Sequence, residues 1–476
     1  MTRTEHDYLG DRQIKSDALY GIHSLRATEN FTNNTPFPID WYKTMGMIKH
    51  ACYLSIKNLY RALDTEGLKS KLEKIIPDRI IESLLSASQD VWEGKYFDHF
   101  IVPAIQGGAG TSINMNVNEI IANVALQKID KKPGDYEIID PIETANIYQS
   151  TNDVVPTALR ITAMKLLVEL EESINYLRYK IEEREKDYRS SARIGYTQMQ
   201  AAVPSTWGKL FSSYSDALAR DWWRVSKCFE RIKIVNLGGG AIGTGVGTPR
   251  FFIMDVITQL QRISGFPVTR SENLNDATSN NDALVEVHAT LKSHAVNLEK
   301  MASDLRLLAS DIAGNQISLP ARQVGSSIMP GKVNPVICEY AVSVAHKVYT
   351  NDMLISNLCG QGCLDLNAYI PVIGNALIES IKLLNSACRS LADNLVEGLK
   401  VNTEKSLQNL YKNPAITTAL LPAIGFNKAA ELAKIMRSKS YDIFKANEKL
   451  GFIEKSKIEK ILTAENLVKL GFSVKE

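Results

Sequence analysis

The segment from Gly325 to Pro335 has the residue types of a catalytic loop. It reads GSSIMPGKVNP and holds two hydroxyls, an ammonium and an amide within nine residues. Its two glycines and two prolines prevent a helix or a strand from running through it. Function concentrates on loops of this kind. The candidate groups are Ser326, Ser327, Lys332 and Asn334.

A second polar segment, QSTND at residues 149–153, directly precedes a long helical pattern. One of its side chains can cap that helix, which is the purely structural interpretation. Ser150, Thr151 and Asn152 together supply more hydrogen-bonding groups than one cap needs. With the backbone N–H groups at the positive end of the helix, they predict a receptor for a carboxylate.

Two other turns carry polar groups. QGGAGTS, at residues 106–112, ends in hydroxyls just before a helical pattern, so it can hold an anion. In the loop GYTQMQ, at residues 195–200, Thr197 and Gln198 can donate or accept hydrogen bonds. GGGAIG, at residues 238–243, matches the dinucleotide pattern GxGxxG but follows a charged helical stretch instead of a strand. Nucleotide binding is therefore not expected.

Long helices must position these loops. Apolar residues recur at alternating steps of four and three along three stretches separated by loops, which is typical of helices of about thirty residues packed in a bundle. The three seams are Ala163, Leu167, Leu170, Ile174, Leu177 and Ile181; Leu284, His288, Leu291, Ala295, Leu298, Ala302, Leu305, Ala309 and Ile312; and Ile373, Leu377, Ile381, Leu384, Cys388 and Leu391. His288 is expected to be a core histidine satisfied by hydrogen bonds.

These patterns predict a mainly α protein. We expect an N-terminal helical domain at residues 1–143, a central long-helix bundle domain at residues 144–400 and a small C-terminal helical domain at residues 401–476. With 476 residues, of which 45% are hydrophobic, the chain can form a large core.

The bulk composition favours a small-molecule partner. Lysine and arginine total 55 against 53 for aspartate and glutamate, so no charge excess attracts nucleic acid or a membrane. The polar N-terminal sequence and the lack of a long apolar run predict a cytoplasmic protein. The six scattered cysteines are expected to be buried free thiols. The seven histidines show no ligand spacing, so neither a metal nor a cofactor is predicted.

Together, GSSIMPGKVNP, QSTND and the segment QGGAGTSINMNVNEIIAN at residues 106–123 resemble the aspartase/fumarase superfamily. The resemblance extends to YGIHSLR at residues 20–26 and IGTG at residues 242–245, so it covers most of the chain. It implies a three-domain fold whose central bundle forms a tetrameric core. It also implies elimination or addition of ammonia, water or an amine across a dicarboxylate.

The resemblance further implies the roles of individual residues. Ser326 matches a loop serine that, as an alkoxide, removes a proton beside a substrate carboxylate. Donors held near that carboxylate lower the barrier because negative charge builds on its oxygens. The residues matched to this role are Thr111, Ser150, Thr151 and Ser327. The remaining substrate-binding candidates are Lys332 and Asn334, on the other carboxylate, with Asn152, Thr197, Gln198 and Arg26, and Glu339 in a supporting role.

A serine is a poor base in water, so the resemblance also implies a loop that closes over the substrate and excludes solvent. Gly325 and Gly331 are expected to act as its hinges. A helix from about Thr157 to Asp187 would be roughly 46 Å long, whereas the next seven or so residues reach at most about 25 Å. QSTND and Thr197 therefore cannot easily meet within one chain. If both belong to the site, as the resemblance implies, the site is shared between subunits, and the homotetramer that is usual in the superfamily would satisfy this.

The choice of leaving group depends on departures within the resemblance. YGIHSLR and the Ala109 in GGAGT are aspartase-like. Gln198 replaces a histidine that fumarases pair with the position of Glu339, so water activation by that pair is unavailable. We expect elimination of ammonia from aspartate to give fumarate. Ala201 and Gly239 depart from the usual pattern, so a carbon–nitrogen lyase acting on a substituted aspartate and a class II fumarase stay open as alternatives.

Overall fold

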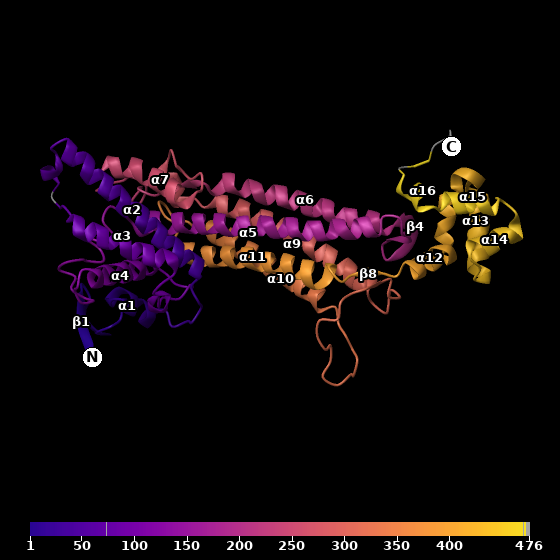
Figure 1. Cartoon of the computed structure of the whole chain (residues 1–476), viewed down its shortest axis with the longest axis horizontal. Coiled ribbons are helices and arrows are strands. Elements are labelled where there is room, and N and C mark those ends of the chain that lie inside the picture. The colour runs from indigo at the N-terminus through magenta and orange to yellow at the C-terminus, as the bar shows by residue number, and fades with distance from the viewer. Residues whose placement is uncertain (73, 470, 473–476) are drawn as a thin grey trace. The chain divides into compact units, whose positions relative to one another are not determined.

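The computed structural model describes residues 1–72, 74–469 and 471–472 (Figure 1). The chain forms two compact units, each assembled from three stretches of sequence. Unit 1 comprises residues 1–170, 224–292 and 348–382, and unit 2 comprises residues 171–223, 293–347 and 383–476. The domain boundaries predicted at residues 143 and 400 stay a prediction.

The N-terminal part of unit 1 begins with an antiparallel hairpin, followed by helices. The elements are β1 (Thr2–Asp7), β2 (Gly10–Lys15), α1 (Ile22–Asn30), α2 (Ile39–Thr65), η1 (Lys69–Lys71), α3 (Asp78–Glu93), η2 (Phe97–His99) and α4 (Thr111–Lys128). Helix α2 packs on α3 at Gly46, where a Cβ atom would lie 2.5 Å from the Trp92 backbone nitrogen. Glycine is required there because only a bare backbone permits this approach.

Five long helices dominate the middle of the sequence (Figure 1). They are α5 (Thr151–Asp187), α6 (Trp207–Ile232), α9 (Asp282–Leu308), α10 (Val336–Cys359) and α11 (Ile370–Leu391). The first and third predicted seams are confirmed, because every residue in them is buried. The second seam is confirmed up to Leu305, but Ile312 was placed in it wrongly. Helix α9 ends at Leu308, and the Ile312 side chain in the following turn is 95% exposed.

His288 has the predicted structural role. Its side chain in α9 is buried, with Nδ1 3.1 Å from Asp352 of α10 and Nε2 2.9 Å from the Ser380 hydroxyl of α11. Both ring nitrogens are therefore satisfied within unit 1. The prediction of buried free thiols is correct for four of the six cysteines, whereas Cys359 is half-buried and Cys363 is exposed.

Short elements connect the long helices. They are β5 (Ile234–Val235), which pairs in parallel with β6 (Thr269–Arg270), α7 (Arg250–Ser264), α8 (Leu274–Ser279), β7 (Ile317–Ser318), which pairs with β8 (Lys400–Val401), and η3 (Ala392–Val396). The expectation of a mainly α fold is confirmed. Strands occur in the described residues as two-stranded pairs, which the helical patterns did not predict.

The C-terminal part of unit 2 is a separate small core. It contains α12 (Thr403–Lys412), η4 (Pro414–Leu420), α13 (Leu421–Lys439), α14 (Ile443–Leu450), α15 (Lys455–Ile461) and α16 (Ala464–Val468). The hairpin formed by β3 (Ala192–Thr197) and β4 (Gln200–Thr206) belongs to this core. Ala192 and Ile194 of β3 are buried in the same cluster as Leu410, Leu420 and Leu432. The segment predicted as a loop is thus a hairpin fixed by C-terminal helices.

Within the described part of the chain, no helix has the length and apolar content that a membrane crossing requires.

Candidate functional site

In unit 1, the helix starts of α4 and α5 lie together. Thr111 is the first residue of α4, and Thr151 is the first residue of α5. The two ends are close, because Asn114 donates to the Thr151 hydroxyl at 3.3 Å and a Cβ at Gly110 would lie 3.1 Å from Val155. Backbone N–H groups at helix starts favour anions. The structure therefore brings two predicted anion-binding segments together.

The hydroxyls at the start of α5 are oriented by the hydrogen bonds that they accept. The Thr151 Oγ1 accepts from Asn114, and the Ser150 Oγ accepts from the Asn152 backbone nitrogen at 3.2 Å. A hydroxyl that accepts within the protein keeps its own O–H available as a donor. Ser150 and Thr151 are half-buried and Thr111 is exposed, so all three are accessible from solvent in unit 1.

Asp153 ties the start of α5 to the glycine-rich turn at residues 238–248. Its buried carboxylate accepts hydrogen bonds from the backbone nitrogens of Gly238, Gly240 and Ser150 at 3.2, 3.0 and 3.0 Å. Burial raises the pKa of this carboxyl to about 6, and the three N–H donors oppose the rise. Asn152 adds a 2.7 Å bond from its side-chain nitrogen to the Ala241 carbonyl. The turn that imitates a nucleotide-binding motif thus positions QSTND.

A chain of polar side chains also reaches Thr151. The Lys49 ammonium donates to Asn146 Oδ1 at 2.9 Å, and the same oxygen accepts from Asn114 at 3.1 Å. Asn114 in turn contacts Thr151. Lys49 is fully buried, and burial lowers its pKa to about 7. A buried lysine that donates a hydrogen bond therefore belongs to the polar network behind Thr151.

The lowered pKa of Lys49 makes the stability of the protein depend on pH. Between the folded value near 7 and the ordinary value of 10.5, the unfolded chain binds the proton more tightly, so stability falls as the pH falls through this window. Each unit of lowering corresponds to about 1.4 kcal/mol. We expect Lys49→Met to remove this fall, so that its melting temperature exceeds that of the wild type by several degrees at pH 7 and approaches it at pH 10.

Thermal unfolding followed by circular dichroism between pH 7 and pH 10 measures this effect. The exposed Lys71 provides the matched control, because Lys71→Met removes a lysine that is not buried. Parallel melting curves for Lys49→Met and the wild type across this range would contradict the prediction.

The aspartase-like segment at residues 20–26 is anchored to α4. The buried Glu119 carboxylate of α4 accepts from the backbone nitrogens of Gly21 and His23 at 2.7 and 2.8 Å, and from the Ser24 hydroxyl. Arg26 makes two 2.7 Å bonds to the Asp7 carboxylate, and this pairing lowers the pKa of Asp7. Arg26 is therefore occupied by the β1–β2 hairpin in this structure.

In unit 2, the loop at residues 325–335 is closed at its base. The Gly325 nitrogen donates to the Lys332 carbonyl at 2.8 Å, and the Asn334 side chain donates to the Gly325 carbonyl at 2.8 Å. At Gly325 a Cβ would meet the Lys332 carbonyl at 2.7 Å, and Gly331 has a φ of +79°. Both glycines therefore satisfy a backbone requirement of the loop. The tip is open to solvent, with the Ile328 side chain 84% exposed.

The Ser326 hydroxyl is hydrogen-bonded within this loop. Its oxygen accepts hydrogen bonds from the backbone nitrogens of Ile328 and Met329 at 3.2 and 3.0 Å. Two N–H donors aimed at one hydroxyl oxygen stabilise negative charge on it. The loop geometry therefore places two backbone donors on the Ser326 oxygen.

The other predicted residues of unit 2 lie on separate elements. Thr197 and Gln198 stand at the tip of the β3–β4 hairpin and are exposed. Gln198 and Met199 have φ values of 50° and 59°, which is the geometry of a two-residue hairpin turn. Glu339, in the first turn of α10, pairs with Arg306 at 3.1 Å. Among the described residues, no hydrogen bond joins the hairpin tip to the loop at residues 325–335.

Sequence reasoning missed the residues that support the site. Lys49, Asn114 and Asn146 come from distant parts of the sequence and share no local spacing, so no pattern indicates them. The roles of Asp153 and Gly240 are visible only once the glycine-rich turn is placed beside QSTND. In the described part of the chain, no group of three or more His, Cys, Asp or Glu side chains is arranged to hold a metal ion.

Residues 10–350 match the model of a protein family described as lyase. The chain is 40% identical to aspartate ammonia-lyase from Bacillus subtilis over 434 residues, which cover 91% of this chain and 89% of the relative. It is 36% identical to aspartate ammonia-lyase from Escherichia coli K12, covering 99% and 97% of the two chains.

Solved structures show the same similarity. The crystal structure of fumarate lyase:delta crystallin from Brucella melitensis bound to cobalt matches with a TM-score of 0.90 and 34% identity, covering 98% of this chain and 99% of that one. Recombinant class II fumarase from Schistosoma mansoni matches with a TM-score of 0.87 and 26% identity, covering 98% of each chain.

Proposed function

This chain belongs to the aspartase/fumarase superfamily of lyases, and we propose that it catalyses the reversible elimination of ammonia from L-aspartate to give fumarate. Relatives named aspartate ammonia-lyase align with almost its whole length. The observation that carries the proposal is the Ser326 hydroxyl, whose oxygen accepts two backbone N–H bonds within the loop at residues 325–335. That arrangement suits a serine that acts as a base.

In the proposed reaction, the Ser326 alkoxide takes the proton from the carbon beside the side-chain carboxylate of aspartate. The electron pair of the C–H bond moves into that carboxylate and forms a doubly negative aci-carboxylate. When the carbon–nitrogen bond breaks, this pair forms the double bond of fumarate and ammonia leaves. Ser326 then returns its proton to solvent. The loop reduces the cost of forming the alkoxide through its N–H groups.

The start of α5 is suited to hold the aci-carboxylate. Ser150 and Thr151 keep their O–H groups available, and the helix start adds partial positive charge. Thr111 lies at the adjacent helix start, and Ser327 follows the proposed base in sequence. Donors preorganised for charge that develops only in the transition state contribute the most to rate.

The remaining residues are assigned to binding. We assign Lys332 and Asn334 to the second carboxylate, and Asn152, Thr197 and Gln198 to the region of the leaving amino group. Glu339, paired with Arg306, would support the loop from the start of α10. Arg26 is paired with Asp7, so we assign it the role of holding the segment at residues 20–26, with any substrate contact requiring release of that pair.

We further propose a homotetramer with sites shared between copies of the chain. Helix α5 has 37 residues, which is about 55 Å at 1.5 Å per residue. Ser150 precedes this helix and Thr197 follows it, five residues into the next strand. A site that uses both therefore draws them from different copies. An active monomer in analytical ultracentrifugation would rule out this assembly.

The substrate is tested by following the ultraviolet absorbance of fumarate. We expect fumarate to form with L-aspartate at a rate at least a hundredfold above that with L-malate or with N-methyl-aspartate. A faster reaction with malate would identify a fumarase, and a faster reaction with the N-substituted substrate would identify a different carbon–nitrogen lyase. Either result would replace the proposal.

A further inference from the structure

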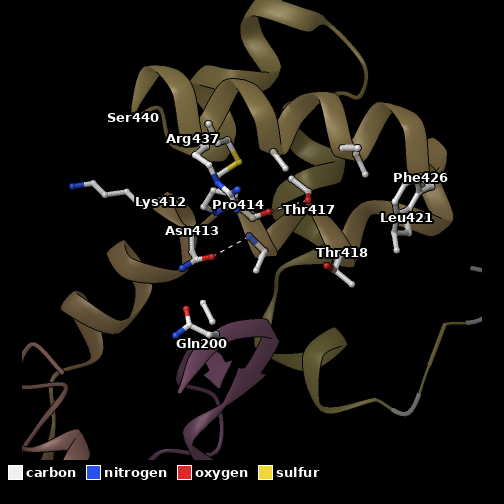
Figure 2. A pocket seen from close by; sticks show the side chains of 16 residues that line it. Gln200, Lys412, Asn413, Pro414, Thr417, Thr418, Leu421, Phe426, Arg437 and Ser440 are labelled. Atoms are coloured by element: carbon white, nitrogen blue, oxygen red, sulfur yellow. Dashed lines mark hydrogen bonds between the residues drawn. The ribbon is translucent and has the colours of Figure 1, made fainter. Parts of the chain in front are cut away.

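A second candidate site lies in the C-terminal core of unit 2. A pocket of about 820 Å³ opens between α13, η4 and the first residues of β4 (Figure 2). Its volume is within the range of pockets that hold small organic ligands. None of the residues assigned to the lyase reaction lines it.

The pocket has one polar end and one apolar end. Figure 2 shows Asn413, Arg437 and Ser440 at one end and Leu421 and Phe426 at the other. The Phe426 side chain is 75% exposed, although it is a large aromatic group. Aromatic side chains are common in the lining of pockets that bind organic ligands. The arrangement suits a molecule with a polar head and an apolar body.

The charge of the side chains that line the pocket indicates which polar head group a ligand should have. Lys412 and Arg437 both line the pocket, and none of the described residues that line it is acidic. Neither side chain forms an ion pair or hydrogen bond with another described residue. Hydroxyls of Thr418 and Ser440 add further possible donors. A cationic lining without a carboxylate favours an anionic head group.

Ala201 adds no charge to this lining. It is the second residue of β4, and it lines the pocket. An aspartate at this position would add a carboxylate to the lining, where it would compete with an external anion for the cationic side chains.

The pocket is connected to the proposed active site through β4. Gln200 and Ala201 line it, and Thr197 and Gln198 stand two to four residues away at the tip of the same hairpin. The hairpin is packed into the C-terminal cluster through Ala192 and Ile194. A ligand that orders α13 and β4 therefore also acts on the position of the hairpin tip.

We propose that this pocket binds a small organic acid, and that binding regulates the lyase reaction through the β3–β4 hairpin. The regulatory part rests on the proposed function, whereas the binding part does not. Binding is tested on the full chain with 8-anilinonaphthalene-1-sulfonate, an anion with an apolar body whose fluorescence rises on binding. Octanoate, which has a carboxylate head, serves as the competing ligand.

We expect Arg437→Gln and Ala201→Asp each to weaken binding of the fluorescent probe about tenfold, and octanoate to displace it from the wild type. Lys434→Gln is the matched control, because Lys434 is an exposed cation of the same helix that does not line the pocket. Equal probe affinity in all four proteins would overturn the proposal. Two variants are used so that a folding defect in one, visible in its melting temperature, leaves the other decisive.

The regulatory part is tested by the KM for aspartate in the presence of saturating octanoate. We expect a change of at least twofold in the wild type and in Lys434→Gln, and no change in Arg437→Gln. An unchanged KM in the wild type, with probe binding intact, would overturn the regulatory part. If aspartate were not a substrate, the fluorescence experiment would still decide whether the pocket binds organic acids.

Discussion

Ser326→Ala is expected to lower kcat at least a thousandfold and to leave the affinity for a substrate analogue within about threefold. A positioned base contributes about 10²–10⁴ to rate, and the oxygen of the proposed base also accepts two N–H bonds that would stabilise an alkoxide. Alanine removes the oxygen but not the carboxylate-binding groups. Steady-state assays with aspartate and calorimetric titration with succinate measure the two quantities.

Ser212 provides the control for this variant. Ser212 is half-buried on α6, as Ser326 is in its loop, and its hydroxyl donates to the Lys209 carbonyl, so Ser212→Ala removes the same atom at a place without a proposed function. We expect the control to keep the full kcat. If Ser326→Ala retained more than about a tenth of the wild-type kcat, Ser326 would not be the base.

Thr151→Val is expected to lower kcat about a hundredfold to a thousandfold, with a melting temperature close to that of the wild type. Removing one preorganised donor from a site of developing negative charge has an effect of this size. Valine keeps the shape of threonine but has no hydroxyl. The Asn114 side chain loses one contact at 3.3 Å and keeps its 3.1 Å bond to Asn146, so the fold should persist.

Thr162→Val is the matched control for this change. Thr162 is buried in the same helix, and its hydroxyl donates to the Ala158 carbonyl one turn earlier. The control should leave kcat within about twofold. A Thr151→Val enzyme with a normal kcat and a raised KM would show that the hydroxyl binds ground state and transition state equally, which contradicts the proposed aci-carboxylate role.

The long helices were predictable because their apolar residues repeat every three to four positions for many turns. That pattern indicates burial independently of the partner, as the first and third seams show. The ends of helices were less predictable. Ile312 continues the spacing, but the chain turns after Leu308, and tertiary context decides where a helix stops.

The hairpin at residues 192–206 was not predictable from its turn. Two-residue turns of this kind favour Asn-Gly, because both central residues need positive φ, and here they are Gln198 and Met199. The sequence therefore lacks the usual signal. What holds the turn is the packing of Ala192 and Ile194 against helices more than two hundred residues later in the chain.

The loop residues of the candidate site were predictable from the sequence, whereas the buried residues that hold those loops in place were not. Ser326, Ser150 and Thr151 stand in polar segments beside glycine, proline or a helix start, where composition alone indicates function. Lys49 stands in an apolar helix and gains its role from Asn146, about a hundred residues away. Contacts of this kind depend on the assembled fold, so no local pattern can reveal them.

The glycine-rich turn at residues 238–248 restricts how the sequence can diverge. A Cβ at Gly243 would lie 2.3 Å from the Asn275 backbone nitrogen, and the residue has a φ of +87°. Asp153 and Asn152 are held by this turn, so a substitution that moves it also moves the helix start beside the proposed substrate. Selection for catalysis should therefore also act against substitutions in this turn, although its residues do not touch a ligand. We expect substitutions at Gly243 to be tolerated as poorly as substitutions at Thr151.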